Sequence, residues 1–106
     1  MRKPIDLEAV ETALEFLAET DVQAGQLKRA VEAHDWLADQ AESRAFLTVE
    51  GTVAERNHRA SLDEEVTKQR QAWLEAIQDS AALENQRKTA QLKVGVWQSI
   101  QKARLG

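Results

Sequence analysis

Two long helical patterns of nearly equal length meet at one interruption in this sequence. Apolar residues recur every three or four positions on both sides of it, as on one face of a helix. They include Leu7, Val10, Leu14 and Leu17 before the interruption and Leu62, Val66, Trp73 and Ile77 after it. The interruption centres on Gly51, which suits the left-handed position that follows a helix end. Matched arms around one break predict an all-α protein, a long antiparallel helical hairpin.

The first arm is expected over residues 6–50. Asp6 is its expected N-cap, because its side chain can accept a hydrogen bond from a backbone amide of the first turn. Thr20 begins a Thr-x-x-Gln sequence, which indicates either a kink near residues 20–25 or a fresh helix start. A fresh start would let the first segment fold back as a third helix of a bundle.

The turn is expected over residues 51–61 and the second arm over residues 62–104. Thr52 and Ser61 each begin an S/T-x-x-E sequence, the pattern of a capping box. Two start signals so close together indicate a short helical turn before the second arm. Gly51, Thr52 and Glu55 are therefore the residues expected to form the hairpin turn.

The composition indicates one helical domain of 106 residues without disulfide or thiolate chemistry. Charged residues make up 30 % of the chain, which has one proline and no cysteine. No apolar run approaches the roughly 20 residues that span a bilayer, and the start of the chain does not look like a signal peptide. We expect a cytoplasmic protein that does not contact membranes.

A two-helix hairpin alone buries little apolar surface, so a chain of this size would be marginally stable. Assembly of hairpins into a dimeric or higher helical bundle, in the manner of a coiled coil, would bury more. The sequence therefore predicts a homo-oligomer. Three large aromatic residues, Trp36, Trp73 and Trp97, are the expected anchors of the core or of the oligomer interface.

The charges are divided between the two ends of the chain. Residues 6–27 carry six acids and no Lys or Arg, and residues 85–106 carry five basic residues and no acid. The basic residues are Arg87, Lys88, Lys93, Lys102 and Arg104. A hairpin would place the two ends side by side, where they would neutralise each other or steer pairing between copies.

Direct contact of these five basic residues with nucleic acid is the alternative interpretation, because Lys and Arg neutralise phosphates. The net charge of −4 and the pI near 5.2 argue against a dedicated nucleic-acid-binding protein.

Signals for metal binding are weak. Glu55 and His58 form a Glu-x-x-His pair, which di-iron bundles use on facing helices, and Glu32 or Glu42 would be further ligands. Such sites lie in the middle of a bundle, whereas Glu55 is explained as the third residue of a cap at the turn. No metal or cofactor is therefore expected.

Signals for catalysis are equally weak, and we expect no enzymatic activity. His34 lies on a seam of small residues and is predicted to be buried and hydrogen-bonded rather than to act as a ligand or a pH switch. Asp35 and Asp39 lie one helical turn apart and are predicted to form a solvated face rather than an acid–base pair.

Three stretches carry a resemblance to a known group of proteins. They are Leu14–Leu17 followed by Thr20-Asp21, Val49–Arg56, and Asn85–Leu92 leading into Val96–Ser99. With them, the chain resembles a group of small tailed-phage and prophage proteins whose C-terminal motif often reads Val-Trp-Arg-Ser. Gln98 replaces that arginine here and removes one positive charge from the basic end.

The resemblance implies a gene neighbourhood of phage recombination and replication, and thus the cytoplasm of an infected bacterium. It implies no activity or cofactor. Together with the helical pattern, it predicts a non-enzymatic accessory protein that acts through protein–protein contacts with itself and with a phage or host protein.

Overall fold

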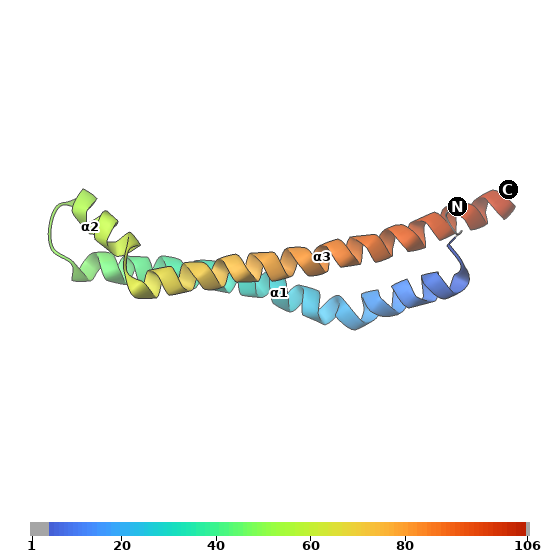
Figure 1. Ribbon diagram of the computed structural model, residues 1–106, viewed down its shortest axis with the longest axis horizontal. Coiled ribbons are helices and arrows are strands. Elements are labelled where there is room, and N and C mark those ends of the chain that lie inside the picture. The colour runs from blue at the N-terminus through green and yellow to red at the C-terminus, as the bar shows by residue number, and fades with distance from the viewer. Residues whose placement is uncertain (1–4, 106) are drawn as a thin grey trace. The chain divides into compact units, whose positions relative to one another are not determined.

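The computed structural model describes residues 5–105, which form three helices and no strand (Figure 1). Helix α1 spans Leu7–Thr48, α2 spans Val53–Ser61 and α3 spans Glu64–Leu105. Within these residues, no helix has an apolar stretch long enough to cross a bilayer. The first four residues, on which the interpretation of the chain start rests, lie outside the described range.

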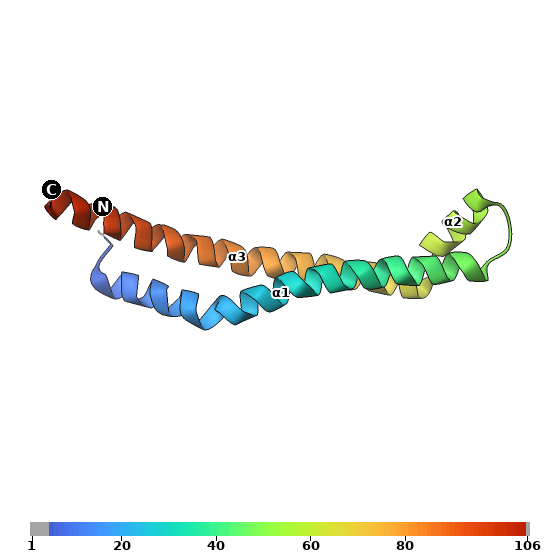
Figure 2. The same ribbon diagram turned by 180° about the vertical axis from the view of Figure 1, so that it is seen from behind.

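The chain divides into two compact units. The terminal unit joins residues 5–25 to residues 81–105, and the turn unit comprises Gln26–Ser80. In the terminal unit, the start of α1 runs antiparallel to the end of α3, and in the turn unit the end of α1 runs antiparallel to the start of α3 (Figures 1 and 2). The prediction of an all-α antiparallel helical hairpin is confirmed.

The two helices contact each other along regular seams. Buried and half-buried positions of α1 and α3 recur at alternating intervals of three and four residues, the spacing of a coiled-coil seam. The α1 series is Val10, Ala13, Leu17, Thr20, Ala24, Leu27, Val31, His34, Ala38, Ala41 and Ala45. The α3 series is Val66, Gln69, Trp73, Ala76, Ser80, Leu83, Arg87, Ala90, Val94, Trp97 and Gln101. Several of these positions are small or polar, so the seam supplies few large apolar contacts.

The core is made mainly of alanine. The buried hydrophobic residues are Val10, Ala13, Ala38, Ala41, Ala45, Ala60, Val66, Ala76, Leu83 and Ala90. In the turn unit, four of these (Ala41, Ala45, Ala60 and Val66) form one cluster, against which Phe46 packs. Alanine side chains let helices approach closely, but each buries only one methyl group, worth about 0.8 kcal/mol.

Helix α1 begins where the sequence predicts and then continues without interruption. The amide of Ala9 donates to Asp6 Oδ1 at 2.8 Å, so Asp6 is the N-cap. Thr20 lies within the helix and its hydroxyl donates to the Phe16 carbonyl at 2.7 Å, so it does not cap a new helix. The predictions of a fresh start at Thr20 and of a third bundle helix are wrong. The kink predicted near residues 20–25 falls at the boundary between the units and stays a prediction.

The turn forms around Gly51 as the sequence predicts. Gly51 has a φ of +124°, a conformation that side chains with a Cβ rarely adopt. Thr52 caps α2, and its hydroxyl accepts from the Glu55 amide at 3.2 Å. A cation–π contact, with the Arg56 guanidinium 5.5 Å from the Phe46 ring centre, also holds α2 against α1.

The second predicted cap is displaced by two residues. Asp63, not Ser61, caps α3, because Asp63 Oδ1 accepts from the amides of Glu65 at 3.0 Å and Val66 at 3.3 Å. The Ser61 hydroxyl instead donates to the His58 carbonyl at 2.6 Å. The predicted start of the second arm at residue 62 is therefore corrected to Glu64.

Candidate interaction surface

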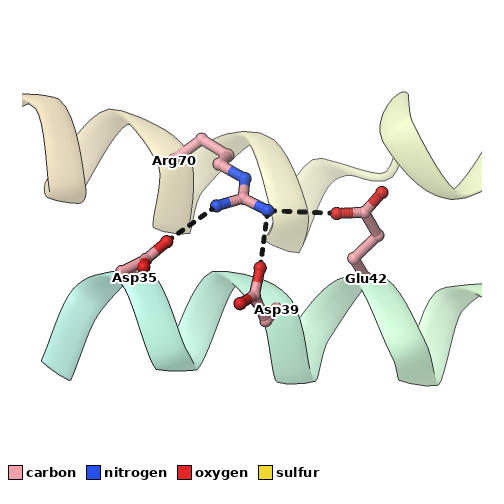
Figure 3. A network of polar contacts seen from close by, with 4 residues as sticks. All are labelled: Asp35, Asp39, Glu42 and Arg70. Carbon is pink, nitrogen blue, oxygen red and sulfur yellow. Dashed lines mark hydrogen bonds and ion pairs between the residues drawn. The ribbon is translucent and has the colours of Figure 1, made fainter. Parts of the chain in front are cut away.

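An arginine clamp joins α1 and α3 in the turn unit. The Arg70 guanidinium donates to Asp35 Oδ1 at 3.3 Å, to Asp39 Oδ1 at 2.9 Å and to Glu42 Oε2 at 3.1 Å. Figure 3 shows Arg70 reaching from α3 to these three carboxylates on α1. The hydrogen bonds with Asp39 and Glu42 raise the pKa of Arg70. Asp39 is exposed and Asp35 is half-exposed, as the prediction of a solvated face expects, and both also belong to an interhelical ion-pair network.

A second arginine lies on the seam of the terminal unit. Arg87 Nη1 donates to the Leu17 carbonyl at 2.8 Å and to Thr20 Oγ1 at 2.6 Å, and Nη2 lies 3.4 Å from Asp21 Oδ1. Its side chain is only 12 % exposed. Burying a cation at a seam is costly unless its donors are satisfied, so these bonds favour one register of the two helices.

The basic residues predicted to contact nucleic acid therefore fall into two groups. Arg87 bonds to residues of α1, and its side chain is mostly buried. The other four, Lys88, Lys93, Lys102 and Arg104, are exposed on α3. The predicted juxtaposition of the acidic start and the basic end is confirmed, since both belong to the terminal unit. Arg87 and Asp21 form the ion pair between them in the described residues.

The three tryptophans are placed differently. Trp73 and Trp97 are half-buried on the seam of α3, so they pack within the hairpin. Trp36 is 61 % exposed on α1. Of the three predicted interface anchors, Trp36 thus has the most surface free for a partner.

His34 is half-buried on the α1 seam, and its Nδ1 is shielded from solvent and has no hydrogen-bond partner among residues 5–105. The prediction of a hydrogen-bonded histidine is wrong for this atom. Glu55 and His58 are both exposed on α2. Across residues 5–105, no cluster of three or more His or acidic side chains is arranged to hold a metal ion.

One groove lies on α3 alone. It has a volume of about 790 Å³, and its lining residues all come from the C-terminal part of α3. We call its central residues the outer α3 face: Leu92, Gly95, Val96, Ser99, Ile100 and Ala103. Leu92 is 68 % exposed and Val96 is 47 % exposed. This segment of α3 is thus apolar on the outer α3 face as well as on the seam, and helices with apolar residues on both sides usually pack on both sides.

A second exposed apolar surface lies on α1 in the same unit. We call it the acidic α1 stripe, and it consists of Leu7, Leu14, Ala18 and Val22 with the acids Glu8, Glu11, Glu15 and Glu19 beside them. All eight residues are exposed.

The sequence did not predict either the arginine pairs or the two exposed surfaces. Arg70 and Arg87 lie 19 and 36 residues after Gly51, whereas Asp39 and Thr20 lie 12 and 31 residues before it, so folding the sequence at Gly51 alone does not pair them. Leu92, Val96 and Ile100 of the outer α3 face recur at helical spacing in the sequence, but periodicity alone does not say which of two apolar faces meets α1.

Comparison with family models, with curated proteins and with solved structures finds no match for this chain.

Proposed function

We propose that this protein is a non-enzymatic helical homo-oligomer that acts through protein–protein contacts. One observation carries the proposal: the described residues bury mainly alanines, whereas thirteen large hydrophobic side chains are exposed. This contrast supports the proposal, because exposed apolar patches commonly mark sites of protein–protein contact.

The energetic argument rests on what association would add. Fully burying a Val, Leu or Ile side chain contributes roughly 1.5–3 kcal/mol, two to four times the contribution of an alanine methyl group. Long helices take most of their stability from tertiary packing of an apolar face. Covering the exposed leucines and valines would thus add more than the existing alanine seam provides.

The biological setting rests on the resemblance to small tailed-phage and prophage proteins. It supports an accessory role in the phage recombination or replication module, in the cytoplasm of an infected bacterium. In that role, the oligomer would bind a phage or host protein.

Light scattering after size-exclusion chromatography tests the proposal. We expect a dimer or larger species whose mass falls on dilution. The variant Trp36→Ala removes an exposed aromatic residue without disturbing the seam and should weaken association, whereas Trp73→Ala and Trp97→Ala would also disturb the hairpin itself. A wild-type protein that stays monomeric at high micromolar concentration would refute the proposal.

Direct nucleic-acid binding is the second candidate, and the four exposed basic residues of α3 favour it. Lys88, Lys93, Lys102 and Arg104 lie in a stretch, residues 85–105, that contains no acid. The acidic start of α1 belongs to the same unit, and its negative charges partly cancel the positive potential of these four residues. We therefore favour protein–protein contacts over nucleic-acid binding.

A further inference from the structure

The terminal unit has a small core. Its buried hydrophobic residues are Val10, Ala13, Leu83 and Ala90. The same unit exposes two apolar surfaces, the outer α3 face and the acidic α1 stripe. A helix pair with so small a core gains from any partner that covers either surface.

The two surfaces have complementary charges. Lys88 lines the groove at one end of the outer α3 face, and Lys102 lines an adjoining hollow that shares Gly95 and Ser99 with this face. Lys93 instead lines a hollow together with Asp6 and Glu8 at the start of the chain in the same unit. Residues 85–105 contain no acid that could offset them. The acidic α1 stripe has four glutamates beside its apolar residues, and residues 6–27 contain no Lys or Arg.

This complementarity of charge indicates which kind of partner fits the outer α3 face. Packing two outer α3 faces against each other would bring like charges together, which disfavours that pairing. An acidic amphipathic helix would place its apolar residues in the groove and its acids beside the basic residues at the edge of the groove. The chain itself carries such a helix in the first half of α1.

We infer that the outer α3 face binds the acidic α1 stripe of a second copy of this chain. The inference rests on the proposed function, since it names the contact by which the homo-oligomer forms. Gly95 and Ser99 leave room for close approach, and a Cβ added at Gly95 meets nothing within 4 Å in the single chain. The groove is thus open to receive side chains such as Leu14.

Each contact pairs two different surfaces: one copy contributes the face and the other contributes the stripe. This holds whether the contacts repeat from copy to copy or occur twice about a two-fold axis. A chain with a damaged face still carries an intact stripe, and the reverse also holds. Two variants that each fail to associate alone should therefore associate when they are mixed.

The experiment uses Leu92→Glu on the outer α3 face and Leu14→Lys on the acidic α1 stripe, each in the full chain. Leu74→Glu and Leu47→Lys are matched controls, because both leucines are exposed on the same two helices outside these surfaces. We expect Leu92→Glu and Leu14→Lys each to weaken self-association about tenfold or more. Both controls should associate like the wild type. Circular dichroism at a concentration where every variant is monomeric checks that helix content is unchanged.

Mixing the Leu92→Glu and Leu14→Lys chains should give a one-to-one complex by light scattering, whereas neither chain alone should form one. Loss of association in Leu92→Glu only would indicate contact between two α3 faces and would overturn the inference. A mixture that stays monomeric would also overturn it. Association unchanged in both variants would overturn this contact while leaving the homo-oligomer standing. A monomeric wild type would refute the proposed function itself.

Discussion

Arg87 on α3 donates a hydrogen bond of 2.6 Å to the hydroxyl of Thr20 on α1. That hydroxyl in turn donates to the carbonyl of Phe16, 2.7 Å away. The two bonds form a chain from one helix to the backbone of the other, at a seam position where an apolar residue would ordinarily lie. Pairing by such polar seam residues specifies the register of two helices at a cost in stability.

Replacing Arg87 with leucine tests this division between stability and register. We expect Arg87→Leu to unfold at the same or higher urea concentration, because it removes a buried charge and keeps the seam filled. Arg87→Ala should lose about 1–3 kcal/mol, since it removes packing and bonds together. Urea unfolding followed by circular dichroism at one fixed protein concentration gives both values, with the exposed Lys93→Ala as the control. A Leu variant less stable than the Ala variant would contradict this account.

Removing the Arg70 clamp should lower stability by about 1 kcal/mol. The Arg70 side chain is 34 % exposed, so solvent screens its three ion pairs and the effect is smaller than for a buried pair. Arg70→Lys should retain part of the effect, because an ammonium cannot reproduce the fork that reaches Asp35 and Asp39 together. The difference between Arg70→Ala and wild type should shrink in high salt. The exposed Arg44→Ala should leave stability within about 0.5 kcal/mol of wild type.

The contribution of the Arg70 clamp to the free energy of unfolding should not change at mildly alkaline pH. Because hydrogen bonds raise the pKa of Arg70, its contribution is fully present below the pKa of an unfolded arginine and is lost only as the pH rises through the higher folded value. The stability difference between wild type and Arg70→Ala should thus be the same at pH 7 and at about pH 10, well below that range. Urea midpoints of both proteins at the two pH values check this, and a difference that vanished at the higher pH would argue against the clamp.

Two glycines offer a matched pair of substitutions with opposite expected signs. Gly51→Ala should cost roughly 1–3 kcal/mol, because the φ of +124° strains any residue with a Cβ and that Cβ would collide with the Glu55 side chain. Gly25→Ala should stabilise by about 0.5–1 kcal/mol, because Gly25 lies within α1 with open space around it. Thermal unfolding by circular dichroism measures both, and equal effects would contradict the assigned turn.

Nucleic-acid binding should be weak or absent. We expect no mobility shift of a labelled single- or double-stranded oligonucleotide at low salt and micromolar protein, because the exposed cations of α3 share their unit with seven acids. A shift that weakens with salt and is reduced in a Lys88→Ala, Lys102→Ala double variant would instead establish the second candidate function.

The sequence predicted the hairpin because its determinants are local. Gly51, Thr52 and Asp6 act on backbone groups within a few residues, and each has the role that its pattern predicts. The errors came where a long-range partner competed with a local one. Thr20 resembled a helix cap, but its hydroxyl bonds within α1 and to Arg87. Ser61 resembled another cap, but Asp63 is a carboxylate placed closer to the amides of α3.

Sequence spacing also could not assign partners to the charged residues. Asp35 and Asp39 read as a solvated pair because nothing nearby in the sequence is basic on that face. Their partner, Arg70, lies 31 residues beyond Asp39. The seam of α3 differs from its outer face only in that α1 packs against the seam. The spacing of residues along α3 gives no information on where α1 lies.

The separation of the contacting residues along the chain also sets the order in which the hairpin closes during folding. The alanine cluster of the turn unit joins residues 41 to 66, whereas Arg87 meets the Leu17 carbonyl across 70 residues. Loop closure costs about 0.6 kcal/mol more for each doubling of the loop, so the contacts next to Gly51 form first at the lowest entropic cost. We expect the hairpin to close from its turn towards its ends and to open in the reverse order. The helix ends that carry the outer α3 face and the acidic α1 stripe would then pack last. Binding of a second copy to these surfaces would coincide with the final step of folding.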